Sequence, residues 1–298
     1  MFRKFALAVA FLTIFAGIGI LMYPAVSNLT YEREQKELVS HYEETAQELP
    51  PDMADAELKS CTDYNDSLRD NDVVLTDPFD ETQLDPSAHP YTTLLNPNRD
   101  GGMGVIEIPS IGVSLMIYHG TSEEILQKGV GHLQGSSLPV GGTGTHSVLS
   151  AHTGLQTKKL FTDLDKLRQK DRFYLHILGE TLAYEVDQIK VVLPNETDAL
   201  MIDSGQDYVT LITCTPYGVN SHRLLVRGTR IPYTEEDSFK EPEKHPGRWQ
   251  DTYRKAASAG VVLAAGLFFA AVHRRRKRRK KIRRRRYIRA KKSGRSRI

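Results

Sequence analysis

Residues 210–228 read TLITCTPYGVNSHRLLVRG, two β-forming runs separated by a turn-rich loop. In the first run Thr210, Ile212 and Cys214 share one face of a predicted strand, because successive side chains alternate. Thr-Pro-Tyr-Gly then fits a β-turn, with proline at its second position and glycine at its fourth. If the two runs pair antiparallel, Cys214 closes one strand where Arg223 opens its neighbour. The pattern therefore predicts a thiol and a guanidinium in one groove.

Short apolar runs broken by Gly and Pro surround this segment. Their length and spacing are typical of an all-β barrel or sandwich. Residues 178–180 (LGE) are expected to join two of them as a hairpin. One stretch is predicted to be helical, because four apolar residues fall on one face: Leu160, Phe161, Leu164 and Leu167. The predicted strands are GVIEIP (104–109), VSLMIYH (113–119), HSVLSAH (146–152), RFYLHIL (172–178), TLAYEVDQIKVV (181–192), YVTLITC (208–214) and RLLVRGTRI (223–231).

Cys214 and Arg223 have the chemistry needed for covalent acyl transfer. The thiolate is the attacking form, and a thiol with an ordinary pKa of about 8.5 reaches it more easily beside a cation. A fixed guanidinium can stabilise the oxyanion of a tetrahedral intermediate. A histidine suits protonation of the leaving amine. Two of the ten histidines are candidates: His152, at the end of a predicted strand, and His222, which would face away from Arg223 in an extended segment.

A structural reading of Cys214 also fits the composition. The chain has only two cysteines, and spacing alone allows one disulfide between Cys61 and Cys214. Cys61 itself has no role that its position suggests. No His, Asp or Glu cluster has convincing metal-ligand spacing, so we expect neither a metal nor an organic cofactor.

Both chain ends have the composition of membrane spans. Phe5–Tyr23 contains 19 residues without a charge and 256–272 contains 17, and about 20 apolar residues suffice to cross a bilayer. Residues 274–298 hold 17 Lys or Arg and no acid, which predicts a cytoplasmic tail under the positive-inside rule. The alternatives are a buried core helix at 256–272, a tail that binds nucleic acid, and a signal peptide cleaved near Ala25-Val26-Ser27.

The middle of the chain is acidic and begins with helices. Between residues 24 and 255, 21 Lys and Arg face all 37 Asp and Glu, a net charge of about −16 that the overall +3 conceals. With the basic ends inside, this part is expected outside the cell. Helices are predicted over 31–47 and 52–68, with Asp52 as a candidate N-cap. Residues 76–100 hold four prolines and show no periodicity, which predicts a long loop.

Three segments together resemble the sortases, cell-wall transpeptidases of Gram-positive bacteria. TLITCTPYGVNSHRLLVRG looks like their catalytic Cys-to-Arg segment. SAHTGLQTKKLFTDLDKL (150–167) resembles the catalytic-histidine segment, and GVIEIPSIGVSLMIYHGTSEEILQKGVGH (104–132) the start of the barrel. The match runs in the right order from about Gly104 to Tyr233. It implies a closed β-barrel with short helices.

The resemblance also assigns roles to residues. His152 maps to the catalytic histidine, Cys214 to the nucleophile and Arg223 to the transition-state arginine, so a disulfide is no longer expected. Thr213 is a candidate for orienting substrate, although a threonine in a strand is ordinarily just β-forming.

Class C sortases, the pilin polymerases, are the most similar class. They carry two membrane spans and an inhibitory lid before the barrel, with an Asp-Pro-aromatic motif that Asp77-Pro78-Phe79 matches. By this resemblance Asp77 pairs with Arg223 and Phe79 covers Cys214. A carboxylate is a natural partner of a guanidinium. The alternative is an ordinary turn, since Asp-Pro pairs are common in loops.

The resemblance implies a membrane-anchored pilin polymerase. Cys214 would cleave the Thr-Gly bond of an LPxTG-like signal through a thioester, and a lysine amine of a pilin would resolve it as an isopeptide bond. The implied partners are pilins or surface proteins bearing that signal and the membrane, without nucleic acid. The alternatives are a housekeeping sortase that joins surface proteins to peptidoglycan, a non-catalytic membrane scaffold, and a protease-like hydrolase.

These expectations divide the chain into seven segments. They are an N-terminal membrane span or signal-anchor (1–23), a helical juxtamembrane segment (24–72), a lid loop (73–100), the catalytic barrel (101–235), a linker (236–255), a C-terminal transmembrane helix (256–273) and a basic cytoplasmic tail (274–298).

Overall fold

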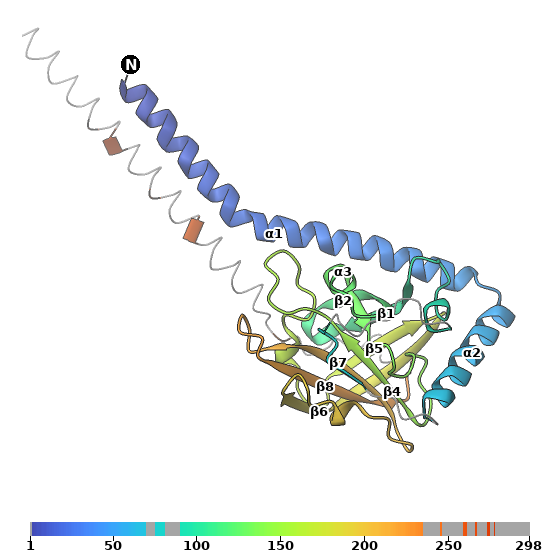
Figure 1. The fold of residues 1–298 in the computed structure, drawn as a ribbon. Helices are drawn as coiled ribbons and strands as arrows, with labels where there is room; N and C mark the ends of the chain where they lie inside the picture. The colour runs from blue at the N-terminus through green and yellow to red at the C-terminus, as the bar shows by residue number, and fades with distance from the viewer. Residues whose placement is uncertain are drawn as a thin grey trace, which may run out of the picture. The chain divides into compact units, whose positions relative to one another are not determined.

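The structure, a computed structural model, describes residues 2–69, 75–80 and 90–234, and seven single positions beyond them: 245, 259–260, 266, 273–274 and 277. The chain divides into two compact units. One is Met22–Trp249, and the other combines Met1–Leu21 with Gln250–Ile298. The strands of the described residues all lie in the first unit (Figure 1).

Eight strands close a β-barrel in the order β1-β2-β3-β4-β7-β8-β6-β5 (Figure 1). The pairs β2–β3 and β4–β7 are parallel and the others antiparallel. The predicted barrel is confirmed and the sandwich is wrong. The strands are β1 Gly102–Ile108, β2 Val113–His119, β3 Val130–His132, β4 Thr145–Ser150, β5 Arg172–Ile177, β6 Glu180–Val192, β7 Asp207–Thr215 and β8 His222–Ile231.

The barrel buries its apolar side chains in separate layers. One large cluster holds Phe173, Leu211 and Val226, all of them fully buried. A second, smaller cluster includes Ile212, the neighbour of Leu211 along β7. Because successive strand residues face opposite ways, β7 contributes to both clusters. Cys214 shares the face of Ile212, so the smaller cluster lies beside the thiol.

Local turns match the sequence in one place and differ in another. The β5–β6 hairpin has two loop residues, Leu178 and Gly179, both with positive φ (46° and 86°), as a type I′ turn requires. The helix predicted around residues 160–167 is wrong. This stretch forms turns and one short 3-10 helix, η4 Leu164–Lys166, because Leu160 adopts a φ of 42° that no α-helix contains.

Two long helices precede the barrel (Figure 1). α1 runs without interruption over Phe2–Glu48, so the predicted helix 31–47 is the second part of a longer one. α2 spans Pro51–Arg69. Asp52 therefore lies in the first turn and is not the N-cap, since Pro51, whose missing N–H costs nothing there, already begins the helix.

Tyr42 of α1 is buried against the barrel. Its hydroxyl donates to the carbonyl of Met103 (3.0 Å) and accepts from the amide of Leu178 (3.1 Å). These bonds join the helix to β1 and to the β5–β6 turn. A buried tyrosine needs such partners for its polar end, so Tyr42 fixes where α1 lies on the barrel.

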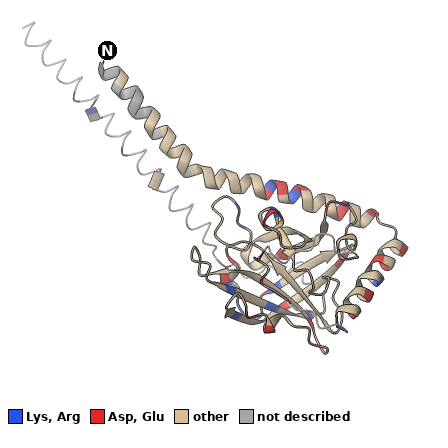
Figure 2. Ribbon diagram, viewed as in Figure 1, with Lys and Arg blue, Asp and Glu red and all other residues tan. Residues whose placement is uncertain are grey.

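Among the described residues, none of the helices has the length and apolarity needed to cross a bilayer. The first predicted span, Phe5–Tyr23, lies within α1. Figure 2 shows charged residues on the second part of α1 and on α2. The second predicted span and the basic tail fall almost wholly outside the described residues.

Candidate active site

Cys214 and Arg223 lie opposite each other on β7 and β8. The antiparallel ladder pairs Cys214 with Arg223 directly, one step from the pair Thr213 and Leu224. Directly opposed residues of an antiparallel pair project on the same face. Cys214 is a half-buried free thiol, and Cys61 on α2 is a buried free thiol. The disulfide alternative is therefore wrong.

His152 lies two residues beyond the end of β4. β4 runs parallel to β7, pairing Ser150 with Ile212, and the amide of Ala151 still donates to the carbonyl of Ile212 (3.2 Å). Continuing this register by two residues brings His152 beside Cys214. The other candidate, His222, pairs with Thr215 and bonds the Ser221 hydroxyl (2.9 Å).

The three predicted catalytic side chains thus come from neighbouring strands. β7, which carries Cys214, is hydrogen-bonded to β4 on one side and to β8 on the other. A thiol between an imidazole and a guanidinium has a base for its proton and a cation for a developing oxyanion. The arrangement is suited to acyl transfer through a covalent thioester.

The lid segment, which we define as residues 75–80, contacts Arg223. Asp77 accepts two hydrogen bonds from it, from Nε to Oδ1 (2.8 Å) and from Nη2 to Oδ2 (2.6 Å). Both side chains are largely buried, with exposed fractions of 15% for Asp77 and 12% for Arg223. This bidentate geometry is the strong form of a carboxylate–guanidinium pair, and it occupies the arginine that a substrate oxyanion would need.

Phe79 lies between the histidine and the arginine. Its ring centroid is 5.8 Å from that of His152, and the Arg223 Cζ lies 5.0 Å over the ring. Phe79 also packs against the smaller cluster, in which Leu75 of the same segment is buried. The lid segment therefore fills the space between two of the predicted catalytic groups.

The surroundings of Cys214 favour the neutral thiol in this arrangement. Burial raises its pKa, the nearby Arg223 lowers it and Asp77 raises it, with a net increase. Burial alone would lower the pKa of Arg223, but its hydrogen bonds to Asp77 and the proximity of Cys214 raise it overall. Asp77 thus opposes the effect that Arg223 has on the thiol.

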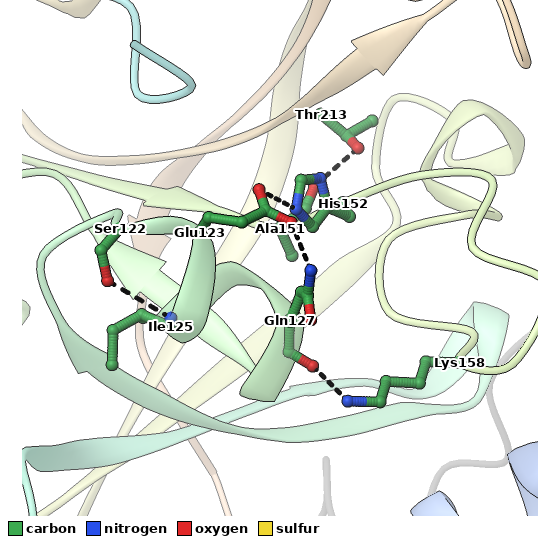
Figure 3. Close-up of polar contacts among 8 residues, drawn as sticks. All are labelled: Ser122, Glu123, Ile125, Gln127, Ala151, His152, Lys158 and Thr213. Atoms are coloured by element: carbon green, nitrogen blue, oxygen red, sulfur yellow. Dashed lines mark hydrogen bonds and ion pairs between the residues drawn. The ribbon is translucent and has the colours of Figure 1, made fainter. Parts of the chain in front are cut away.

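Thr213 is buried and supports the strand end that carries the histidine. Its hydroxyl donates to the carbonyl of Ala151 (2.7 Å), the residue before His152 (Figure 3). The hydroxyl is therefore engaged within the protein. A substrate-orienting role for Thr213 stays a prediction.

Sequence reasoning did not single out Glu123, which contacts His152. Its Oε2 lies 3.1 Å from His152 Nε2 (Figure 3). Glu123 begins α3, Glu123–Lys128, after the N-cap Ser122, whose hydroxyl accepts from the Ile125 amide (3.4 Å). The Ser-Glu-Glu signal of a helix start is visible in the sequence. The contact is not, because 29 residues separate its partners.

In the part of the chain that the structure describes, no group of three or more His, Cys, Asp or Glu residues could hold a metal ion. Nothing in the geometry of Cys214, His152 and Arg223 requires one, since each of the three roles above belongs to a side chain.

Comparison with known proteins assigns this arrangement to a family. The family described as Sortase domain matches residues 106–231. The sortase C1 of GBS pilus island 1 is 43% identical, with a TM-score of 0.63 over 70% of this chain and 98% of that one. Sortase C-1 from Streptococcus pneumoniae is 47% identical, with a TM-score of 0.62 over 66% and 100%. Sortase A of Listeria monocytogenes is 28% identical over 55% of this chain and 72% of its own.

Proposed function

The chain belongs to the sortase family, with class C sortases as its structural neighbours, and from this premise we propose that it joins pilin subunits through lysine isopeptide bonds. Its chemistry is that of a cysteine transpeptidase. The proposal rests on the ladder pair of Cys214 and Arg223 beside His152. The engagement of that same arginine by a segment preceding the barrel favours class C.

The first half-reaction would acylate the enzyme. The Cys214 sulfur attacks the threonine carbonyl carbon of an LPxTG-like signal, and Arg223 stabilises the oxyanion of the tetrahedral intermediate. The C–N bond to glycine breaks as His152 gives its proton to the leaving amine. The threonine acyl group is then held as a thioester.

The second half-reaction would transfer the acyl group. The amine of a pilin lysine attacks the thioester, loses a proton to His152 and forms an isopeptide bond, while the Cys214 sulfur leaves. A water in place of the amine gives hydrolysis instead. The ratio of amine transfer to hydrolysis therefore separates a transpeptidase from a protease-like enzyme.

The lid segment would act as an inhibitor in this cycle. Asp77 holds the guanidinium that the oxyanion needs, and Phe79 lies against both His152 and Arg223. Substrate would have to displace both side chains before Cys214 can react.

The test uses the full chain in detergent with an LPxTG-type peptide and intact mass spectrometry. We expect an acyl adduct that is absent from Cys214→Ala and forms faster in the double variant Asp77→Ala, Phe79→Ala. No adduct with either LPxTG-type or neighbouring-pilin signal peptides, even in the lid variant, would contradict the proposed function.

Choice of acceptor separates pilus assembly from peptidoglycan anchoring. A pilin fragment with its lysine and a peptidoglycan cross-bridge peptide would compete for the thioester. Faster transfer to the lysine is expected, and preferred transfer to the cross-bridge amine would instead identify a housekeeping sortase. A Cys214→Ala chain that still supports pilus assembly would favour a non-catalytic scaffold.

For localisation we propose two membrane spans, 1–23 and 256–273, with both termini cytoplasmic and the barrel outside. The proposal rests on the 17 basic residues after residue 273 and on the acidic middle of the chain. A C-terminal tag on intact cells should resist protease while the barrel is cleaved. A tag that is digested under the same conditions would rule the topology out.

A further inference from the structure

His152 is held by a carboxylate from another element of the fold. Glu123 Oε2 lies 3.1 Å from His152 Nε2, where the histidine side chain is 19% exposed and the glutamate 49%. The two residues come from different elements, α3 and the end of β4 (Figure 3). The contact is therefore a product of the tertiary fold and not of local sequence.

The contact determines which nitrogen of His152 carries hydrogen. An ionised carboxylate only accepts hydrogen bonds, so Nε2 must be the donor. The neutral ring then has Nδ1 as its acceptor, and in the part of the chain that the structure describes Nδ1 has no hydrogen-bond partner. A ring held in this way can take the thiol proton at Nδ1 and later give it to the leaving amine.

Glu123 is itself held in place by its own helix. Gln127 Nε2 donates to Glu123 Oε1 (2.6 Å), one turn further along α3, which leaves Oε2 for His152. Lys158 in turn donates to the backbone carbonyl of Gln127 (2.6 Å; Figure 3). The carboxylate is thus oriented by a neutral donor, and no cation competes with His152 for it in these contacts.

We propose that Glu123 is a positioning residue that fixes the orientation and the tautomer of the His152 ring through Nε2. The inference rests on the proposed function, because it assigns His152 as the acid–base of the acyl transfer. The logic is that of a carboxylate orienting an imidazole beside a nucleophile.

The other charged and titratable groups around His152 come from three further elements. Asp77 of the lid segment and Arg223 of β8 neutralise each other. Cys214 of β7 is the proton donor to the ring. Lys158 is engaged with the Gln127 carbonyl. Glu123 is therefore the carboxylate that holds the His152 ring.

The test measures acylation by the full chain with the LPxTG-type peptide. Removing a general acid costs about 10²–10⁴-fold, so loss of the residue that positions it should cost about tenfold in Glu123→Gln, mainly in kcat. Glu123→Asp, which keeps the charge on a shorter side chain, should recover part of the rate.

The matched control is Glu124→Gln, which removes the same charge from the neighbouring residue of the same helix turn. It should keep the wild-type rate within about twofold, because such exposed charges contribute little. Equal rates in the two variants would overturn the positioning role while leaving the proposed function intact.

A second measurement does not depend on the peptide. Ring ¹⁵N NMR of the full chain, with His152 assigned by its loss in His152→Gln, should show the neutral Nε2–H tautomer. Glu123→Ala should weaken that preference and Glu124→Ala should not. An Nδ1–H tautomer in the wild-type chain would refute the inference even if the peptide fails to react.

Discussion

Two segments on either side of residues 81–89 are fixed to the barrel in opposite ways. The lid segment is held by the ion pair of Asp77 with Arg223, at the site of the proposed chemistry. The anchor segment, which we define as residues 90–100, is held in the interior by a buried tyrosine and by the Leu95 amide, which donates to Glu57 (2.7 Å). Tyr91 is almost fully buried there, and its hydroxyl binds the carbonyl and ring of His132 and the amide of Gly120.

The two contacts differ in the free energy that is needed to break them. Arg223 and Asp77 can both be solvated again when the lid segment lifts, so opening leaves neither charge buried without a partner. Tyr91 leaves a cavity and three unsatisfied polar groups if it moves. The lid segment can therefore be displaced from the barrel, whereas the anchor segment remains bound.

Replacing Tyr91 tests the anchor segment and should have the largest effect on the free energy of unfolding. Tyr91→Ala should lower the free energy of unfolding by about 3–5 kcal/mol, as for other large aromatic side chains in a core. Tyr91→Phe should cost about 1–3 kcal/mol, because only the hydrogen bonds are lost. Urea denaturation of the full chain in detergent measures both. A loss under about 1 kcal/mol in Tyr91→Ala would mean that the segment is not anchored there.

Low pH should destabilise the contacts of the anchor segment with His132. Burial lowers the pKa of His132 to about 4, only partly offset by its hydrogen bond to Ser137. The unfolded chain binds this proton near pH 6.5, so the contribution to stability is full above that pH and is lost as pH falls through about 4. Its size is on the order of 3 kcal/mol.

His132→Gln isolates this effect, since the slope of unfolding free energy against pH should flatten between about 6.5 and 4. His146 is buried in another part of the barrel and has its pKa lowered to about 4 as well, and burial also lowers the pKa of His119. Both residues contribute to the remaining slope. Identical slopes for His132→Gln and the wild type would argue against a neutral buried His132.

Replacing Asp77 tests the contact of the lid segment with Arg223. Asp77→Ala should speed alkylation of Cys214 about tenfold, because the lid segment loses the bidentate ion pair that holds it on Arg223. Because Asp77 contributes to the raised pKa of Cys214, the labelling curve should also shift to lower pH. Cys61 is fully buried and contributes little background. Unchanged labelling would count against an inhibitory lid.

Phe79 should have the smallest effect. Its contact with the guanidinium is worth about 0.5–1 kcal/mol, so Phe79→Leu should speed labelling only about two- to fivefold. Phe79→Ala, which also removes the apolar cover, should lie between this variant and Asp77→Ala. If Phe79→Leu increased the labelling rate of Cys214 more than Asp77→Ala did, the ion pair would not be the main contact that keeps the lid segment closed.

Much of the barrel could be predicted because its strands are long enough to show a pattern. β3, Val130–His132, was missed since three residues carry no periodicity and its partner β2 runs parallel to it. The closure of β1 on β5 joins residues about 70 apart, which no local signal encodes. Strand spacing alone predicted either a barrel or a sandwich, and the resemblance to sortases indicated the barrel.

The site was predictable where partners lie close in sequence. Cys214 and Arg223 share one hairpin, so their pairing follows from turn and alternation. Their contacts with the lid segment and with His152 span more than 60 residues and needed the resemblance. Neither the sequence pattern nor the resemblance identified Glu123, because its residue type and exposure are ordinary for the start of a short helix.

The placement of Cys214 between β4 and β8 has an evolutionary consequence. A backbone ladder fixes the spacing of the thiol and the guanidinium. The Asn220 carbonyl between β7 and β8 accepts a hydrogen bond from Arg223 Nη1 (3.2 Å), but this contact uses only the backbone. The side chains of residues 216–221 can therefore change without moving Cys214 or Arg223. A family built in this way can diversify what it recognises while the reaction itself is inherited intact.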